Sequence, residues 1–491
     1  MTPVHHRRVL PGLQAFRVLA SSAVLALGAL SGAPALAQGQ AQVQALPASV
    51  DAALARAKVP RDAVTMLVID AENARPPRLA WRSQVRVAPA SIMKLVTTYA
   101  ALDLLGPAFT WTTPVYIDGP VRNGVLDGNL YIRGQGDPTL VIQRLWLLLR
   151  RVQGLGIQHI NGDIVLDRSA FEVGDIDPSA FDGEGQRPYN AVPDALLVNF
   201  KSVVMTFMPN RFTQTAQINY EPPLAGVAMP PAVPLAAAGE CGDWRTALGG
   251  NFSDPARIAF GGSYPAACGE KVWPVAYIDP SSFAARAVGG LWAEMGGKLK
   301  GQVRDGRVPA QLQPAFEVSS PPLAEVVRDI NKYSNNVMAQ QLFLTLGLQI
   351  RHRGNAESAR ATLDQWWNER IGTGEGQPVL DNGSGLSRES RISAAELGKM
   401  LQVAWRSPVM SELVSSLPIS GIDGSLRDRS FRSGAVSHLK TGTLRDAAGV
   451  AGFVDRADGR RWIVVAIANH PNAVAARPAF DALVDWVANG N

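Results

Sequence analysis

Cysteine and histidine are scarce in this 491-residue sequence, and their placement argues against a metal site. Beyond the N-terminal pair His5-His6, the histidines stand alone along the chain: His159, His352, His438 and His470. No H-E-x-x-H or C-x-x-C motif, which would set two ligands at metal-binding spacing, occurs anywhere. We therefore predict that the protein needs no metal ion and no organic cofactor.

Long hydrophobic runs are missing after residue 37. The apolar stretch 141–149 is interrupted by Gln143 and Arg144, and no later stretch approaches 18 uninterrupted apolar residues. A helix needs about 20 such residues to cross a bilayer. We therefore expect no stable membrane span in the mature protein.

The first 37 residues have the pattern of a cleavable signal peptide. Arg7 and Arg8 precede the uncharged apolar run 18–30, and Ala35-Leu36-Ala37 offers small residues for cleavage before Gln38. The alternative is a membrane anchor, but a run of about 13 residues is too short to span a bilayer. The sequence thus predicts a periplasmic protein, secreted through this leader.

Neither sign of charge is in clear excess once the leader is removed. The whole chain has a formal net charge of +5, but the leader carries three arginines and no acid, which leaves a net charge of +2. This small excess gives no support to a nucleic-acid partner. With 46% hydrophobic and 18% charged residues, the chain is long enough for two or three globular domains.

The two cysteines, Cys241 and Cys268, both follow the leader. Because an exported protein meets an oxidising compartment, we expect a disulfide between them. The alternative is a pair of free buried thiols.

Hydrophobic periodicity predicts a mixed α/β protein. Residues 65–70 and 79–87 are typical of a strand pair, whereas 108–309 is rich in glycine and proline and contains short β-like segments at 130–133, 162–166 and 203–207. A hairpin is expected at 449–454 and 461–468. The remaining periodic segments predict helices at 52–57, 90–105, 323–348, 356–371 with Asn355 as its N-cap, and 477–487.

Ser91 and Lys94 form an S-x-x-K pattern at the start of the predicted helix 90–105. Residues i and i+3 share a helix face, so the hydroxyl and the amine can meet. A serine hydroxyl needs an adjacent base, and a desolvated lysine can serve once its pKa falls, whereas arginine does not deprotonate. The chain has 9 lysines against 38 arginines, which makes lysine at this position notable.

Two further motifs follow Ser91-x-x-Lys94 along the chain. Ser334-Asn335-Asn336 is an S-x-N pattern at the junction into a helical segment, and Lys440-Thr441-Gly442 precedes the hairpin. Ser437-His438-Leu439-Lys440 is a second S-x-x-K match, but in an extended segment its ends point to opposite faces. We expect His438 to be a packed strand residue.

The order S-x-x-K, S-x-N, K-T-G resembles that of the serine penicillin-recognising enzymes. The gap of 243 residues between Ser91 and Ser334 leaves room for inserted domains. It is similar to that of the class C low-molecular-mass penicillin-binding proteins, the D-alanyl-D-alanine carboxypeptidase/endopeptidase or penicillin-binding-protein 4 family. Three further segments, covering 128–138, 381–388 and 421–426, also resemble that family.

The resemblance implies a β-lactamase/transpeptidase-like domain, with an antiparallel sheet flanked by helices, that carries inserted β-rich domains. After the signal peptide (1–37), this domain is expected at 38–108 and again at 305–491. The insertion at 109–304 is expected to hold one or two domains.

The resemblance also implies residue roles for a serine D,D-peptidase. Ser91 would attack the carbonyl of the penultimate D-alanine, and Lys94 would accept its proton. Ser334 would relay a proton to the leaving amine, and Asn336 would hold the substrate amide and Lys94. Lys440 would favour a neutral Lys94 and attract the terminal carboxylate.

The K-T-G segment and an outer pocket would bind the rest of the substrate. Thr441, Gly442 and Thr443 would form the carboxylate site, and the N–H groups of Ser91 and Thr443 would form an oxyanion hole. For the outer pocket, the resemblance suggests Arg388 and an acid at Glu184 or Asp182. The sequence departs from the family pattern around these acids. Arg445 is a further candidate, and an ordinary surface arginine is the alternative for Arg388.

The expected partners are peptidoglycan stem peptides as substrates and β-lactams as covalent inhibitors. The nearest alternative is a serine β-lactamase, since Tyr333-Ser334-Asn335 also fits a Y-x-N motif, but no E-x-x-x-N segment lies between Asn336 and Lys440. An alternative of another class is a non-catalytic cell-wall-binding protein. The intact Ser91, Lys94, Ser334 and Lys440 argue against it.

Overall fold

The computed structural model describes residues 45–237, 239–372 and 377–490. These residues belong to one compact unit. The predicted signal peptide, residues 1–37, lies outside the described residues.

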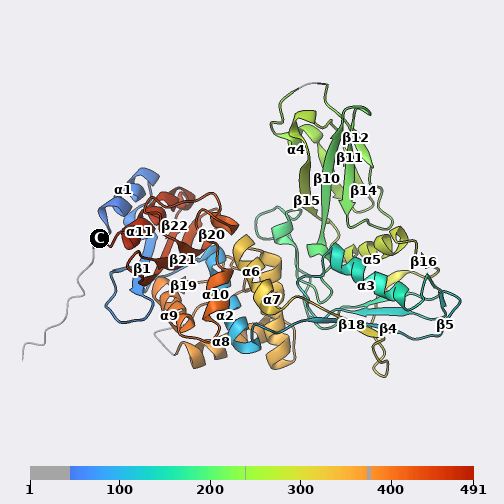
Figure 1. Cartoon of the computed structure of the whole chain (residues 1–491), viewed down its shortest axis with the longest axis horizontal. Coiled ribbons are helices and arrows are strands. Elements are labelled where there is room, and N and C mark those ends of the chain that lie inside the picture. Colours follow the sequence, from blue (N-terminus) through green and yellow to red (C-terminus); the bar gives the residue numbers. More distant parts are fainter. Residues whose placement is uncertain (1–44, 238, 373–376, 491) are drawn as a thin grey trace, which may run out of the picture. The chain divides into compact units, whose positions relative to one another are not determined.

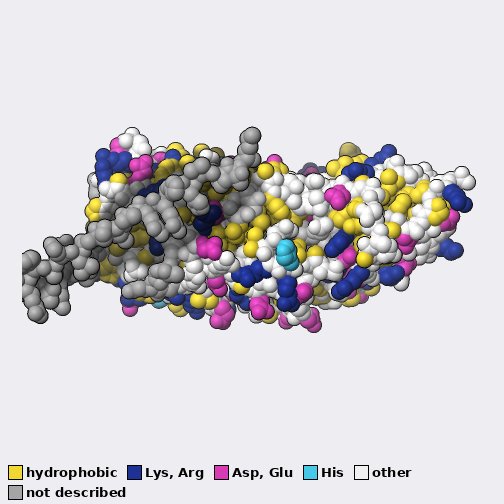
Figure 2. All heavy atoms as spheres, turned by 90° about the horizontal axis from the view of Figure 1, so that it is seen from below, with side chains coloured by type: hydrophobic (Ala, Val, Ile, Leu, Met, Phe, Trp, Pro, Cys, Tyr) yellow, Lys and Arg dark blue, Asp and Glu magenta, His cyan; other side chains and the backbone are white. Residues whose placement is uncertain are grey.

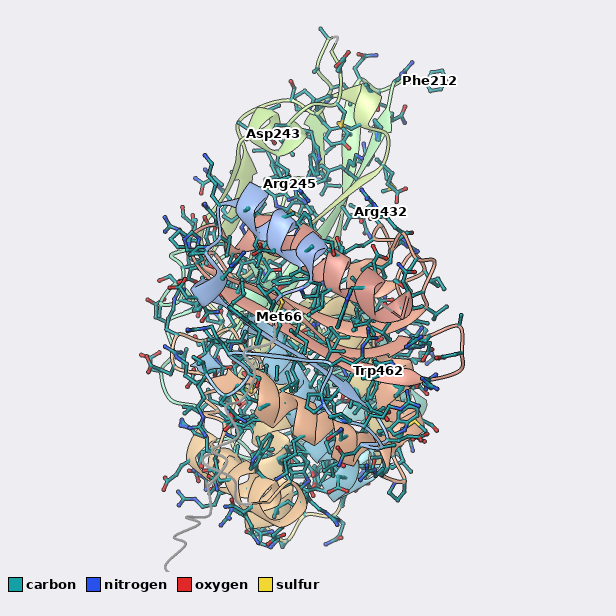
Figure 3. All side chains as sticks on the ribbon, turned by 90° about the vertical axis from the view of Figure 1, so that its left-hand side faces the viewer. Met66, Phe212, Asp243, Arg245, Arg432 and Trp462 are labelled. Atoms are coloured by element: carbon teal, nitrogen blue, oxygen red, sulfur yellow. A yellow bond between two sulfur atoms is a disulfide. The ribbon has the colours of Figure 1, made fainter. Side chains whose placement is uncertain are left out.

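The first sheet is built from both ends of the described chain. It is antiparallel throughout, in the order β2-β1-β22-β21-β20. Figure 3 labels Met66 on β1 and Trp462 on β22, two strands that pair from Val64 to Asp70. The expected hairpin is confirmed as β21–β22, and β20 is an edge strand. The bounds are β2 (Leu79–Trp81), β1 (Val64–Asp70), β22 (Arg461–Asn469), β21 (Ala447–Asp455) and β20 (Ser437–Thr443).

Helices cover both faces of this sheet (Figure 1). Alternate residues of β1 point to opposite faces: Met66 and Val68 pack with α1 (Ala48–Ala57) and α11 (Arg477–Ala488). Leu67 and Ile69 join the core that contains α2 (Lys94–Leu105), α9 (Ala394–Trp405) and α10 (Met410–Ser416). The predicted mixed α/β class is confirmed.

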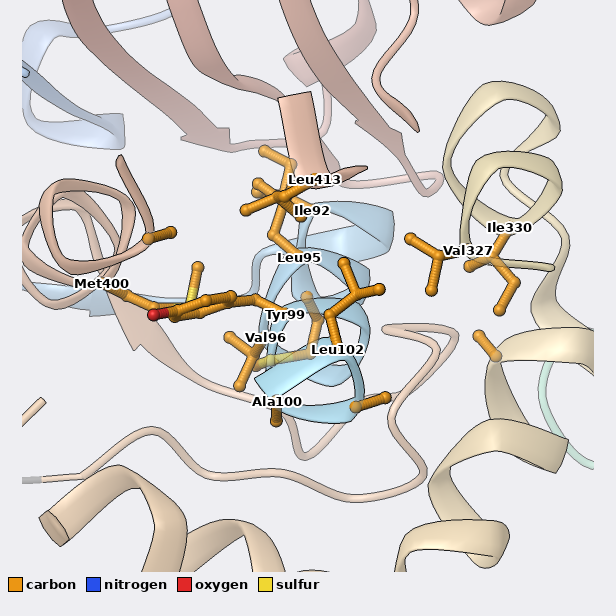
Figure 4. Close-up of a cluster of buried hydrophobic side chains, with 14 of the residues drawn as sticks. Ile92, Leu95, Val96, Tyr99, Ala100, Leu102, Val327, Ile330, Met400 and Leu413 are labelled. Atoms are coloured by element: carbon orange, nitrogen blue, oxygen red, sulfur yellow. The ribbon is translucent and has the colours of Figure 1, made fainter. Parts of the chain in front are cut away.

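Helix α2 lies in the middle of the larger core. Its residues from Lys94 to Leu102 are all buried, so it is enclosed on every side rather than on one face. In Figure 4 its side chains lie near Met400 of α9 and Leu413 of α10. On another side they face Val327 and Ile330 of α6 (Leu323–Tyr333). A short 3-10 turn, Ala90–Met93, precedes it and carries Ser91. The packing holds this turn firmly against the edge strand β20.

The segment 323–348, predicted to be helical with the S-x-N motif at a junction into a helix, is two helices. Helix α6 (Leu323–Tyr333) ends at Ser334, whose backbone is left-handed at φ 55° and ψ 36°. Asn335 then caps α7 (Asn336–Arg351) by accepting a bond from the Met338 N–H. The break places the S-x-N motif at a partly exposed corner between the two helices. Helix α8 (Ala356–Arg370) follows with Asn355 as the predicted N-cap.

The region between α2 and α6 forms further sheets. A mixed sheet has the order β17-β9-β7-β4-β18, with strands β17 (Val303–Asp305), β9 (Ile164–Asp167), β7 (Leu130–Arg133), β4 (Thr112–Ile117) and β18 (Phe316–Ser319). A second sheet, β16-β8-β6-β5, consists of β16 (Lys298–Leu299), β8 (His159–Ile160), β6 (Val125–Leu126) and β5 (Val121–Arg122). The strands expected at 130–133 and 162–166 are confirmed as β7 and β9.

A third group of strands follows β9 along the chain. The sheet β12-β11-β10-β15 contains β12 (Ala232–Pro234), β11 (Thr215–Glu221), β10 (Ser202–Asn210) and β15 (Lys271–Ala276), and the hairpin β13–β14 spans Gly250–Asp254 and Arg257–Phe260. The expected strand at 203–207 is confirmed as β10. Helix α4 (Trp244–Leu248) packs here, and Cys241 and Cys268 are joined by a disulfide.

Three helices of this region, α4 and the two that follow here, were not predicted from the sequence. Helix α3 (Ile142–Gly154) buries Leu145, Leu148, Leu149 and Val152, and α5 (Phe283–Glu294) packs in the same core. The spacing of the α3 leucines is helical, but Gln143 and Arg144 obscured it by marking the stretch as a broken apolar run. The short pair β3 (Arg86–Val87) and β19 (Ile392–Ser393) completes the strands of the described residues.

The division into an interrupted catalytic domain and an insertion remains a proposal. We place its second junction after Ser319 rather than at 304, because β18 pairs with β4 and β17 pairs with β9. Within the described ranges, no helix is long and apolar enough to cross a membrane. On the face drawn in Figure 2, basic and acidic side chains are mixed with one another.

Candidate active site

Ser91 lies in a tight turn that the surrounding backbone shapes closely. Ala90 has a positive φ of 52°, an unusual conformation for a residue with a side chain. Gly385, itself at φ +76°, lies against the Ala90 carbonyl, where a Cβ would come within 1.9 Å of the oxygen. Ala90, Ile92 and Met93 are buried while Ser91 is partly exposed. The turn therefore presents this one hydroxyl to solvent.

Lys94 is fully buried one helical turn beyond Ser91. Its Nζ lies 2.6 Å from Asn336 Oδ1, 2.6 Å from the Ser384 carbonyl oxygen and 3.0 Å from Ser91 Oγ. The Asn336 Nδ2 donates to the Tyr189 carbonyl at 3.3 Å, which fixes its Oδ1 toward the lysine. Two of the three partners of Lys94 are thus pure acceptors.

This arrangement suits a neutral amine. A neutral –NH₂ has two N–H donors, which the two carbonyl oxygens accept, and one lone pair that remains for the Ser91 hydroxyl. Burial lowers the pKa of Lys94 well below its usual value of 10.5, and the nearby Lys440 charge lowers it further. The arrangement therefore fits the predicted roles of Lys94 as a base and Ser91 as a nucleophile.

Lys440 connects the other two motifs. It is fully buried in β20, and its Nζ donates to Ser334 Oγ at 2.9 Å and to the Thr441 carbonyl at 2.8 Å. Burial lowers the pKa of Lys440 from 10.5 to about 7. The left-handed turn at Ser334 is what aims its hydroxyl at this strand, so the break between α6 and α7 shapes the site.

The edge strand β20 passes unusually close to the Ser91 turn. A Cβ on Gly442 would lie 2.9 Å from the Pro89 carbonyl oxygen and 3.1 Å from the Ile92 nitrogen. Contacts this short are tighter than a side chain normally allows. Glycine at 442 therefore allows β20 to pass in close contact with the turn that carries Ser91.

The three motifs are in direct contact, Lys94 with Asn336 and Ser334 with Lys440, and the chain matches the D-Ala-D-Ala carboxypeptidase 3 (S13) family over residues 46–490. The chain belongs to this family.

Two relatives of this S13 member come from different bacteria. A D-alanyl-D-alanine carboxypeptidase DacB of Haemophilus influenzae is 26% identical over 394 residues, which are 77% of this chain and 80% of the relative. A D-alanyl-D-alanine carboxypeptidase of an Actinomadura species is 27% identical, over 76% of this chain and 71% of its own. The crystal structure of penicillin binding protein 4 from H. influenzae has a TM-score of 0.69 at 23% identity, covering 89% of this chain and 99% of that one. The S13 chain thus has the penicillin-binding-protein 4 fold.

The structure of this S13 member brings together the five residues expected to be catalytic. Ser91, Lys94 and Asn336 are in contact on one side, and Ser334 and Lys440 are in contact on the other. The second S-x-x-K match is extended, as expected, and Ser437 Oγ is buried without a partner in the described residues.

The expected carboxylate site follows Lys440 along β20. Thr441 Oγ1 and Ser425 Oγ are 2.7 Å apart, and Arg477 donates to Thr443 Oγ1 at 3.0 Å. His438 is a half-buried residue of the same strand, and burial lowers its pKa. No motif in the sequence indicated that Arg477, from the start of α11, reaches this edge.

The candidates for an outer pocket lie on neighbouring loops. The Arg388 guanidinium lies 4.6 Å from the centroid of the Phe181 ring and donates to Asp446 at 3.1 Å. The loop that carries Asp182 and Glu184 is therefore next to Arg388. However, Glu184 pairs with Arg187 at 3.1 Å, and Asp182 accepts bonds from Tyr189 and Asn190.

Arg445 is exposed and adjoins Asp446 in sequence. The outer-pocket roles of Arg388, Glu184, Asp182 and Arg445 stay predictions.

Two groups in the site were not expected from the sequence. The Ser384 carbonyl holds Lys94, and the Tyr189 carbonyl holds Asn336. Both are main-chain atoms, which any residue carries, so the residue types give no signal. The only clue was indirect: glycines at 383 and 385, both with positive φ, flank Ser384.

The buried lysines give the stability a defined pH dependence. In the folded protein Lys440 loses its proton near pH 7, while in the unfolded chain it keeps it to about 10.5. Because the unfolded state then binds more protons, the free energy of unfolding rises with pH across this window, by about 1.4 kcal/mol per unit for one group.

We expect the melting temperature of the wild type to rise relative to that of Lys440→Met between pH 7.5 and 9.5. Methionine keeps the volume and removes the titration. Parallel pH curves for the two proteins would contradict the lowered pKa of Lys440.

Proposed function

We propose that this chain is a secreted serine D,D-peptidase that hydrolyses D-alanyl bonds of peptidoglycan peptides through an acyl-enzyme on Ser91. The observation that carries the proposal is the position of the buried Lys94 amine, whose Nζ lies 3.0 Å from Ser91 Oγ and 2.6 Å from the carbonyl oxygens of both Asn336 and Ser384. Membership of the S13 family supports the substrate class.

Acylation begins with proton transfer from Ser91 Oγ to the Lys94 lone pair. The hydroxyl oxygen attacks the carbonyl of the penultimate D-alanine, and the carbonyl electrons move to the oxygen. The N–H groups of Ser91 and Thr443 stabilise this oxyanion, a contribution of about 3 kcal/mol for each donor. Asn336 keeps the amine in place throughout, because its Oδ1 accepts from Lys94.

Collapse of the tetrahedral intermediate breaks the C–N bond. Ser334, held by Lys440, relays to the leaving amine the proton that Lys94 took from Ser91, which leaves Lys94 neutral again. The amine departs with its carboxylate between Lys440, Thr441 and Thr443. A bound carboxylate favours the charged form of Lys440 and so raises its pKa above the free-enzyme value of about 7. Water then hydrolyses the ester of Ser91, with Lys94 again as the base.

Penicillins would acylate the same hydroxyl, since they offer a strained amide next to a carboxylate. No metal ion or organic cofactor takes part in the proposed steps. The leader at 1–37 and the disulfide Cys241–Cys268 support export to the periplasm.

The decisive test is incubation of the purified mature protein with a pentapeptide ending in D-alanyl-D-alanine and, separately, with a fluorescent penicillin. We expect release of D-alanine, measured by mass spectrometry, and stable labelling that Ser91→Ala abolishes. Rapid turnover of the penicillin would indicate a β-lactamase instead. Absence of both labelling and hydrolysis would indicate a wall-binding protein without catalysis.

A further inference from the structure

An aromatic-walled cavity of about 420 Å³ opens directly beside Ser334 and Asn336. Its other walls come from the inserted region: Tyr189, Phe200 and the start of α3 at Gln143. Tyr333 and Tyr189 are 69% and 42% exposed, so both rings are available to a ligand. The volume is in the range of cavities that enclose a small organic ligand, and it far exceeds what an alanine methyl needs.

The cavity wall is held in a strained shape. Asn199, Phe200 and Lys201 are three consecutive residues with positive φ, at 42°, 53° and 51°. Such backbone is strained for residues with a side chain and persists only where the surroundings enforce it. Here Asn199 Nδ2 donates to the Ser202 and Glu221 carbonyls, at 2.9 and 3.1 Å.

An ion pair also stabilises the segment with positive φ. The Lys201 ammonium pairs with the buried Asp194 at 2.8 Å. The cavity beside Ser334 is therefore preformed rather than a gap between mobile loops.

We propose that this cavity binds the amine-side strand of a cross-linked substrate, the part of a second stem peptide that leaves when the D-alanyl bond is cut. The proposal rests on the function proposed above, in which Ser334 delivers a proton to the leaving amine. Whatever is attached to that amine must therefore pass Ser334, and the space beyond Ser334 is this cavity.

The chemistry of the lining fits such an occupant. In a cross-link the amine belongs to a diamino acid, whose carbon chain continues into a second peptide, whereas in a free pentapeptide it belongs to D-alanine. The aromatic walls suit methylene groups, and the exposed amide of Gln143 suits a peptide group. Glu221 is the one charged side chain among the described residues lining the cavity.

The cavity adjoins a second hollow that a longer leaving strand could also occupy. A neighbouring hollow of about 690 Å³ shares Pro188, Tyr189 and Pro274 with it. This hollow runs to Asp243 and Arg245 of the disulfide-bearing region, which are labelled in Figure 3. The two cavities together provide room for several residues beyond the scissile bond.

The test is a substitution that narrows the cavity at an exposed residue outside the core. Gln143 is exposed at the start of α3, so Gln143→Trp is expected to fold normally and to fill part of the space. We expect kcat/KM for a cross-linked muropeptide dimer to fall by about 10-fold. The rates of D-alanine release from a pentapeptide and of penicillin acylation should stay within about twofold of wild type. Leu147→Trp, on the same helix but outside the cavity and 58% exposed, is the matched control and should change none of the three.

The outcomes separate this inference from the proposed function. A wild-type protein that cleaves neither peptide overturns the proposed function itself. A wild type that trims the pentapeptide but leaves the dimer intact, or a Gln143→Trp variant that lowers both activities equally or neither, overturns the role of the cavity alone.

Discussion

Replacement of Lys94 with arginine is expected to lower the rate constant for acylation by a penicillin by about 10²- to 10⁴-fold, the contribution typical of a positioned general base. Arginine keeps several donors but stays charged and cannot give up its proton, so, unlike a neutral lysine, it cannot accept the one from Ser91. The wild-type lysine can, because burial and the charge of Lys440 lower its pKa. Stopped-flow measurement with a fluorescent penicillin provides the rate constant directly.

The control for this change is another buried lysine. Lys201→Arg keeps the ion pair with Asp194, a partner that Lys94 does not share, and should acylate at the wild-type rate. Melting temperatures of both variants show whether each has folded. If folded Lys94→Arg protein acylates as fast as the wild type, then the base lies elsewhere and the proposed mechanism is wrong.

Gly442→Val is the second change with a large expected effect. A Cβ at 442 meets the Pro89 carbonyl oxygen at 2.9 Å and the Ile92 nitrogen at 3.1 Å, both of them backbone atoms that cannot swing aside. Either β20 or the Ser91 turn must move. A shift of about 1 Å between reacting groups can lower the rate by about 10²-fold, and we expect a loss of acylation of this size.

The glycine substitution also has a matched control. A Cβ added to Gly174 would have no atom within 4 Å, and this glycine has no positive φ, so Gly174→Val should retain full acylation. Comparing the two variants separates the effect of crowding from that of adding a β-branched residue. Wild-type acylation by Gly442→Val would show that the strand and the turn adjust to each other freely.

The convergence of the three motifs was predictable because it depends on side chains. Ser91, Lys94, Ser334, Asn336 and Lys440 all carry groups whose types and order in the sequence are informative. The contact of Ser384 with Lys94 was not predictable, since it is made by a main-chain oxygen. The junction at Ser334 was indicated by the S-x-N motif alone, because the hydrophobic spacing of α6 and α7 runs on through a left-handed residue.

The fold of the inserted region was predicted least well, for a different physical reason. Its sheets join distant segments: β4 pairs with β18 about 200 residues later, and β9 pairs with β17 across about 140 residues. Local periodicity cannot specify such pairings. The strands β7, β9 and β10 could be located, but not their neighbours. Helix α3 was hidden by Gln143 and Arg144 despite four buried residues at helical spacing.

The pairing of β1 with β22 has a consequence for biosynthesis. Strand β1 can pair with β22 only after the roughly 390 residues between them have been synthesised, and pairings so distant along a chain form slowly. The strand that supplies Lys440 also follows Ser91 by about 350 residues. A partly translated chain would therefore contain Ser91 without the groups that surround it, and hydrolytic activity would arise only after this sheet has formed.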